Sequence, residues 1–298
     1  MTEFVLTQMH IEVARNSTDD FNLFHDKNRW QTIQTNPFSG PVALGFQLGC
    51  FVEDQVKRSD KSYSNCRKVD EPELNISIYE LTFAGVVKPG DTLSMHIKKG
   101  RYSKVNGETF FSNRIALKAN GKIVLLGNKR QSSQFNLHGL ENLPGFEQIK
   151  SSPDRSFIAD SDCFLKRKYM IVGNAKNFLG SAFAEQSEYI DEFIDKVSFP
   201  DTYPMSLVSS ALLERAMAKG HDLIKKPMIY TSHKLSIDQT VLSTLKSNDM
   251  LSIVVSAPEE FPESGNIKYY CTGILSNEDI LFEAEIQLAP LSCLTKKI

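Results

Sequence analysis

The sequence predicts an α+β protein in which two antiparallel sheets each wrap around a long central helix. Two segments, residues 41–56 and 203–219, are apolar nearly all round and carry a proline at or near their start, a pattern typical of a buried helix. Strand-like runs separated by turn signals follow each of these segments. The chain has 298 residues, which is enough for two domains of ordinary size. We therefore expect the same arrangement of elements twice in one chain.

The first sheet is predicted after the helix over residues 41–56. Its first strand, residues 76–83 (ISIYELTF), is rich in residues that favour strands, and the Pro-Gly turn at 89–90 predicts a hairpin to the following strand. The Asn-Gly pairs at 106–107 and 120–121 are strong signals for type I′ turns. The strands expected in this part cover residues 76–83, 92–102, 109–118 and 122–127. They would form an antiparallel meander behind one central helix.

The second part repeats this order after the helix over residues 203–219. The strands expected there cover residues 231–237, 250–256, 266–275 and 280–288. Between the two parts, residues 131–162 contain scattered Ser, Pro, Gly and Asn without sustained apolar periodicity, which predicts a connection. The chain is therefore expected to divide into residues 1–130, a linker over 131–162, and residues 163–298.

A long buried helix wrapped by an antiparallel sheet is the hot-dog arrangement, and the sequence predicts it twice, as a double hot-dog. Two such units side by side can pair their sheets into one continuous layer, which covers the edge strands that a single unit leaves open. Because one chain already supplies both units, we expect either a monomer or a homodimer of such pairs.

Composition and charge exclude several classes of protein. A formal net charge of -2 gives no support to a nucleic-acid partner. The five cysteines form no CxxC pair, which argues against a disulfide framework and a zinc site, and neither His221 nor His233 has ligand partners at metal spacing. No run approaches the ~20 apolar residues that cross a bilayer, and no signal peptide is evident, so we expect a cytoplasmic protein without a membrane span. A Gly-rich phosphate loop and a G-x-S-x-G elbow are both missing from the sequence.

The residues that could carry chemistry lie just before the first predicted helix, where Asp20, Asn22 and His25 fall close together. A carboxylate and an imidazole that both reach one water can remove its proton and later return a proton to a reacting carbon. On a regular helix these two side chains would diverge, so their convergence requires an irregular turn. The alternative is structural: Asp20 and its neighbours are good N-cap residues, and His25 could be an ordinary, partly exposed side chain.

The resemblance of three sequence blocks to a known family favours the catalytic interpretation over the structural one. The blocks DDFNLFH (19–25), NPFSGPVALGF (36–46) and LTFAGVVKPGDTL (81–93) occur in the order seen in the (R)-specific enoyl-CoA hydratases, also called MaoC-like dehydratases, and the chain resembles that family. The resemblance implies that Asp20 and His25 hold and activate a water, and that Asn22 helps to fix them. It also implies that the backbone N–H of Gly45 binds the thioester oxygen at the start of the central helix. No metal or separate cofactor is expected.

The departures from the family pattern also bear on the prediction. Leu44 replaces the histidine that precedes the glycine, which could narrow the substrate range, weaken activity, or mark a protein that has drifted in function. The second half lacks the first block, and the resemblance implies that this degenerate half shapes an acyl tunnel. Glu214 could be a second catalytic acid, but Ser198 stands where a histidine would be required, so we interpret Glu214 as a solvated or ion-paired helix residue.

These observations lead to one expected function and two alternatives. We expect hydration of trans-2-enoyl thioesters to (R)-3-hydroxyacyl thioesters, or the reverse dehydration, on an acyl group carried by coenzyme A or by an acyl carrier protein. The alternatives are a hot-dog acyl thioesterase and a non-catalytic acyl-binding partner subunit. In the first of these the same water would attack the thioester carbon.

Overall fold

One long antiparallel sheet forms the frame of the protein. The computed structural model describes residues 3–61, 73–105, 107–135 and 143–295. Thirteen strands join in this sheet, and the main path runs in the order β1-β3-β5-β6-β2-β11-β15-β14-β12-β8-β7. The first-half strands are β1 (Phe4–Val5), β2 (Ile76–Phe83), β3 (Thr92–Ile97), β4 (Arg101–Val105), β5 (Glu108–Ala119) and β6 (Lys122–Ser132). Those of the rest of the chain are β7 (Ser156–Phe157), β8 (Phe164–Tyr169), β11 (Met228–Asp238), β12 (Met250–Val255), β13 (Glu259–Phe261), β14 (Asn266–Leu275) and β15 (Ile280–Pro290).

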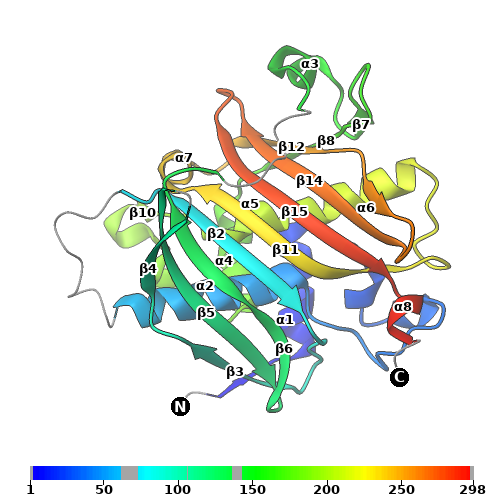
Figure 1. Ribbon diagram of the computed structural model, residues 1–298, viewed down its shortest axis with the longest axis horizontal. Helices are drawn as coiled ribbons and strands as arrows, with labels where there is room; N and C mark the ends of the chain where they lie inside the picture. Colours follow the sequence, from blue (N-terminus) through cyan, green and yellow to red (C-terminus); the bar gives the residue numbers. More distant parts are fainter. Residues whose placement is uncertain (1–2, 62–72, 106, 136–142, 296–298) are drawn as a thin grey trace.

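The two halves meet in the middle of this sheet. Strand β2 pairs antiparallel with β11, with Leu81 opposite His233 and Tyr79 opposite Leu235. The prediction of two paired hot-dog sheets is confirmed, because a single ladder joins them into one layer. Figure 1 shows β2 and β11 side by side at the centre of the sheet, with the first-half strands on one side and the second-half strands on the other.

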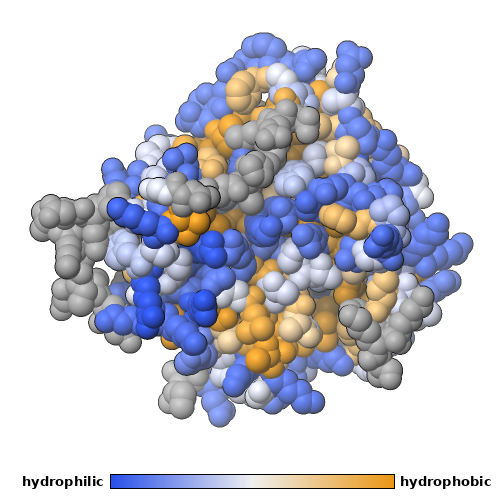
Figure 2. Space-filling view, viewed as in Figure 1, coloured by the Kyte–Doolittle hydropathy of each residue, from blue (hydrophilic) through white to orange (hydrophobic). Residues whose placement is uncertain are grey.

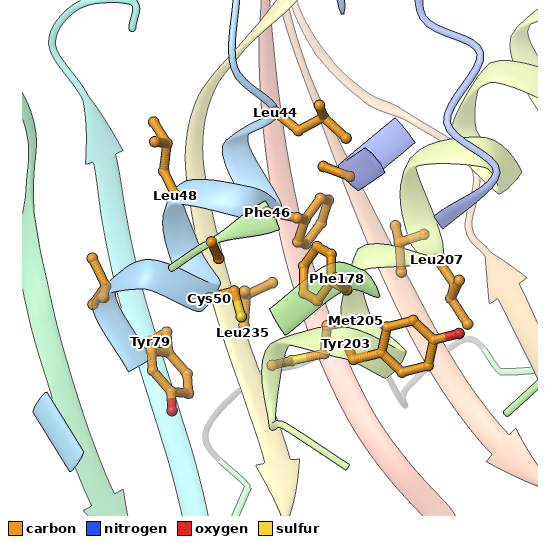
Figure 3. Close-up of a cluster of buried hydrophobic side chains, with 14 of the residues drawn as sticks. Leu44, Phe46, Leu48, Cys50, Tyr79, Phe178, Tyr203, Met205, Leu207 and Leu235 are labelled. Atoms are coloured by element: carbon orange, nitrogen blue, oxygen red, sulfur yellow. The ribbon is translucent and has the colours of Figure 1, made fainter. Parts of the chain in front are cut away.

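The main helices lie together on one face of the sheet (Figure 1). They are α1 (Gln8–Thr18), α2 (Gly45–Lys61), α4 (Val172–Ser181), α5 (Thr202–Ser206) and α6 (Val208–Ala218), and shorter helical elements are α3 (Phe146–Ser151), α7 (Gln239–Thr244) and α8 (Ser292–Thr295). Buried side chains from α2, α4, α5 and β11 form one hydrophobic core, and Figure 3 shows Phe46, Phe178, Met205 and Leu235 meeting in it. Within the part of the chain that the structure describes, no helix is both long enough and apolar enough to span a membrane.

The other face of the sheet is largely polar over the first half. Figure 2 shows hydrophilic side chains gathered on this face over β4 and β5, and a hydrophobic patch over β6, where Ile123 and Leu126 are exposed. His96 of β3, Lys98 just after it and Arg114 of β5 are exposed. This alternation of buried and exposed positions is expected for a sheet with helices on one face only.

A polar contact ties the two central helices together. The carboxyl group of Glu53 on α2 accepts hydrogen bonds from the backbone N–H groups of Asp201 and Thr202 at the start of α5, both at 2.9 Å. It also accepts one from the hydroxyl of Thr202 at 2.7 Å. The first-half helix thus satisfies backbone donors that the start of the second-half helix leaves without intrahelical partners.

Two predictions about the first half are wrong in detail, and one helix was not predicted. Helix α2 begins at Gly45, not at residue 41, because residues 41–44 are held extended by bonds from Val42 N–H to the Phe24 carbonyl (2.9 Å) and from Ala43 N–H to the Val87 carbonyl (2.8 Å). The hairpin across the 89–90 turn is absent: β2 pairs with β6 and β11, whereas β3 pairs with β1 and β5. The opening segment contains helix α1, which the sequence did not predict.

The second helix and the linker also differ from expectation. The predicted helix over 203–219 is two helices, α5 and α6, which are separated at Leu207. The predicted linker over 131–162 contains α3 and β7. Ile149 and Ile158 of this segment form a small core with Leu165, Val254 and other residues of the second-half sheet. The segment therefore covers part of the sheet as well as connecting the two halves.

Candidate active site

An irregular turn after α1 buries an acid and an imidazole close together. Asp19 ends α1 in the left-handed conformation with φ 55°, and the chain then turns into a short 3-10 helix, η1 (Leu23–His25). The Asp20 carboxylate accepts a hydrogen bond from the Asn22 N–H at 2.8 Å, and the Asn22 side chain accepts one from the Phe24 N–H at 3.1 Å. Asp20 is 4% exposed and His25 is 5% exposed. The turn that the sequence argument required is present.

The hydrogen bonds of His25 define which nitrogen can act as a base. Its Nδ1 lies 2.7 Å from the backbone carbonyl oxygen of Val42. Since a carbonyl oxygen can only accept, Nδ1 carries the proton and a neutral ring leaves a lone pair on Nε2. Nε2 is buried and has no hydrogen-bond partner among the described residues. Burial lowers the pKa of His25, and the nearby Asp20 carboxylate acts in the opposite direction.

The second half of the chain supplies the other contacts of Asp20. Ser209 on α6 donates a hydrogen bond to Asp20 Oδ2 at 2.7 Å, and its hydroxyl also lies 2.9 Å from the hydroxyl of Tyr230 on β11. Burial raises the pKa of Tyr230, which keeps its hydroxyl protonated. The sequence analysis missed both residues. Ser209 is 189 positions from Asp20, and no local motif marks either residue.

Tyr230 lines a hollow of about 300 Å³ at the start of α2, which we call the helix-start hollow; Asp20 and Ser209 lie behind its wall and are not among its lining residues. Asn22, His25 and Gly45 line it. The rest of its lining is mostly apolar and includes Phe24, Phe38, Val42, Leu48, Phe83, Val87, Met228 and Ile229. A water or thioester held there would have few competing polar groups around it.

Gly45 allows the surroundings to pack closely against the first turn of α2. A Cβ atom at this position would lie 2.9 Å from Cζ of Phe83 and 3.0 Å from Cε1 of His233, so a larger residue would need its neighbours to move. The first amides of a helix have no intrahelical acceptor and carry partial positive charge. An oxyanion can therefore bind at Gly45. Leu44, by contrast, does not line the helix-start hollow, because its side chain is 2% exposed and packs in the main core (Figure 3).

A second hollow, of about 440 Å³, lies next to the first; we call it the α6 hollow. The two hollows share Asn22, Phe24, Met228 and Tyr230. The α6 hollow lies between α6 and strands β11, β14 and β15, and its lining includes Leu212, Leu213, Ala216, Ile267, Tyr269 and Leu288. Lys219 and His221 also line it.

The other acid considered from the sequence is engaged elsewhere. Glu214 Oε1 forms ion pairs with Lys166 at 3.0 Å and with Arg155 at 3.2 Å, which confirms its interpretation as an ion-paired helix residue. Within the described ranges, no group of three or more His, Cys, Asp or Glu side chains is arranged to hold a metal ion.

Comparisons with known proteins identify the fold. No protein-family model and no curated protein sequence matches the chain. A solved MaoC-like dehydratase matches 96% of this chain and 95% of its own, with a TM-score of 0.62 and 12% identity. A MaoC domain protein dehydratase from Chloroflexus aurantiacus has the same TM-score and identity, with 97% of this chain and 93% of that chain covered.

A third similar structure is a conserved hypothetical protein from Mycobacterium tuberculosis that is described as having a double hotdog fold. It matches 97% of this chain and 94% of its own, with a TM-score of 0.60 and 12% identity. The likeness expected from the three sequence blocks is confirmed in the structure: the chain has the double hot-dog fold that the MaoC-like dehydratases have.

Proposed function

We propose that this protein is a lyase that adds water to trans-2-enoyl thioesters to give (R)-3-hydroxyacyl thioesters, or catalyses the reverse dehydration. The observation that carries the proposal is the state of His25. Its Nδ1 is committed to the Val42 carbonyl, and its unpartnered Nε2 lies buried beside Asp20 at a mostly apolar hollow. A neutral imidazole so oriented is a general base for one water.

The reaction then follows from the position of each group. His25 Nε2 takes a proton from the water while the water oxygen forms a bond to C3 of the enoyl group. The C2–C3 double bond shifts toward C1, and negative charge develops on the thioester oxygen at the Gly45 N–H. The imidazolium returns the proton to C2, which completes the addition. Asp20 stabilises the transient positive charge on His25, in agreement with its effect on the pKa of that ring.

The place of the acyl chain is part of the same proposal. The α6 hollow is lined mainly by the second half and is a neighbour of the helix-start hollow, with Tyr230 in the lining of both. An acyl chain whose thioester lies at Gly45 could extend into it and remove apolar surface from water. The second half would then shape the acyl tunnel, as the family resemblance implies, and it would carry no second catalytic pair.

The test is the loss of absorbance of the conjugated enoyl thioester. Purified protein is incubated with crotonyl-CoA and a longer homologue, and free thiol is measured in parallel. Wild type should consume the enoyl signal without releasing thiol, and Asp20→Asn and His25→Ala should reduce the rate by about 10²-fold or more, as expected when a general base is removed. His96→Ala is the matched control because His96 is exposed on the opposite face of the sheet.

Other outcomes have distinct meanings. Release of thiol would indicate a thioesterase and would reject the hydratase proposal. Full activity in His25→Ala would reject the assigned base even if hydration occurred. If no coenzyme A thioester of any length reacts, the same assay with acyl-carrier-protein thioesters decides between a carrier-protein substrate and a non-catalytic binding subunit.

A further inference from the structure

A second buried histidine has no evident structural reason to be a histidine. His233 on β11 is 0% exposed, and neither ring nitrogen has a hydrogen-bond partner among the described residues. Buried polar groups are nearly always paired, because an unsatisfied donor loses its bonds to water without compensation. Leucine or phenylalanine would fill such a site at lower cost, so the imidazole calls for a ligand-based explanation.

The surroundings of His233 place it at the start of α2. Its ring stacks on Phe46 with centroids 4.4 Å apart and meets the edges of Phe83 and Tyr230 at 4.8 Å and 4.9 Å. Its Cε1 would lie only 3.0 Å from a Cβ atom at Gly45. Gly45, Phe83 and Tyr230 all line the helix-start hollow. His233 itself is not among the lining residues; its ring lies directly behind them, next to Gly45, whose backbone amide we assign to the thioester oxygen.

The ring is in a form suited to polarise a carbonyl group. Burial lowers the pKa of His233 to about 3, so the ring is neutral at physiological pH and carries one N–H. A neutral imidazole N–H can donate to a developing oxyanion without bringing a full charge into an apolar site. The rings of Phe46, Phe83 and Tyr230 pack around it, and the Tyr230 hydroxyl is engaged with Ser209 and not with His233.

We propose that His233 donates its ring N–H to the thioester carbonyl oxygen, beside the N–H of Gly45, so that the two halves of the chain share one oxyanion site. This inference rests on the proposed function and assigns a catalytic residue to the half that lacks the sequence block. The N–H meets its acceptor only when a thioester is bound, which accounts for its unpaired state here.

Two variants, each of which keeps a different property of the imidazole, test the role of His233. His233→Phe keeps an aromatic ring against Phe46 and loses the N–H donor, whereas His233→Gln keeps an N–H donor and loses the ring. The proposal predicts that kcat for crotonyl-CoA falls about 10²-fold or more in His233→Phe, as for the loss of an oxyanion donor, with a smaller loss in His233→Gln. The melting temperature of His233→Phe should equal or exceed that of wild type, since an unpaired polar group is replaced by an apolar one.

A purely structural role predicts the reverse order of activities. If His233→Phe is as active as His233→Gln, or remains within about threefold of wild type, the proposal is overturned. The order of the two variants decides the matter even if both are less stable than wild type. Activities are compared at a temperature at which each variant is folded by circular dichroism.

A binding measurement separates this proposal from the proposed function. Histidine ring nitrogens are labelled with ¹⁵N, the His233 signals among the six histidines are assigned with His233→Gln, and butyryl-CoA is added. A shift of the His233 ring signals on binding supports donation to the thioester carbonyl, even if wild type proves unable to hydrate any enoyl thioester. Binding of butyryl-CoA without a shift at His233 would overturn it.

Discussion

Ser209→Ala is the most informative single change, because it removes a second-half group that touches the first-half catalytic pair. The serine hydroxyl donates to Asp20 Oδ2 at 2.7 Å and lies 2.9 Å from the Tyr230 hydroxyl. Without it, the buried carboxylate loses one of the donors that fix its orientation toward His25. Hydrogen bonds to charged groups contribute about 1.5–3 kcal/mol, which corresponds to about a 10- to 150-fold loss in rate if the full contribution is realised in the transition state.

The assay is steady-state hydration of crotonyl-CoA, with kcat and KM determined separately. We expect the loss in kcat, because the oriented carboxylate stabilises the imidazolium that forms only during the reaction. Ser210→Ala is the matched control: Ser210 is the next residue on α6, is equally buried, and donates to the Leu207 carbonyl at 3.0 Å instead of to Asp20. If Ser209→Ala retains kcat within about threefold of wild type, or loses no more than Ser210→Ala does, the positioning role of Ser209 is refuted.

Three further predictions concern pH, chain length and stability. Since His25 must be unprotonated in the hydration direction and burial lowers its pKa below 6.5, the acid limb of kcat/KM should be centred below pH 6.5; an acid limb centred above 6.5 would contradict this. Leu213→Trp should fill part of the α6 hollow and raise KM for long enoyl thioesters more than for crotonyl-CoA, and equal effects on both would exclude that hollow as the acyl site. Burial and the Asp201 carboxylate raise the pKa of Glu53 from 4.5 to about 8, so the folded protein binds a proton that the unfolded chain has released; the free energy of unfolding should therefore fall as pH rises through this range. Urea unfolding at several pH values should show this slope in wild type and much less of it in Glu53→Gln.

Local sequence patterns predicted the elements whose signals are themselves local. Strand β2 begins and ends at the predicted residues, Ile76 and Phe83, because its β-branched and aromatic residues lie between clear breaks. The turn around Asp20 and Asn22 was also predicted in outline, since its hydrogen bonds join residues two positions apart. Hydrogen bonds between residues so close in the chain can be inferred from the local sequence alone.

Strand pairing was predicted less well, because it depends on contacts between distant segments. The turn at residues 89–90 is real, with Gly90 at φ +93°, and it does not close a hairpin. The chain after β2 is held by bonds to other elements: Ala84 and Gly85 donate to the Val124 carbonyl, and Val87 accepts from Ala43. A turn signal predicts a change of direction, whereas the partner of the next strand is chosen by the whole sheet.

The sequence could not predict which second-half residues contribute to the site, because strand geometry alone would place them on opposite faces of the sheet. Side chains alternate between the two faces of a strand, so residues three apart, such as Tyr230 and His233, should face opposite sides. The pairing of β11 with β15 shifts register between Tyr230 and Ser232, where Thr231 is passed over. The extra residue brings both rings to the helix side of the sheet, 4.9 Å apart, one beside Ser209 and the other beside Gly45.

This register shift explains how a half without the sequence block can still contribute to the proposed site. It directs one hydroxyl toward the Asp20 network and one imidazole toward the helix start, and both positions depend on β11 lying directly beside β2. The proposed site is therefore complete only when β11 is paired beside β2. A change that moved β11 by one residue against β2 would turn Tyr230 and His233 to the other face, leaving Asp20, His25 and Gly45 in place without the groups that complete the site.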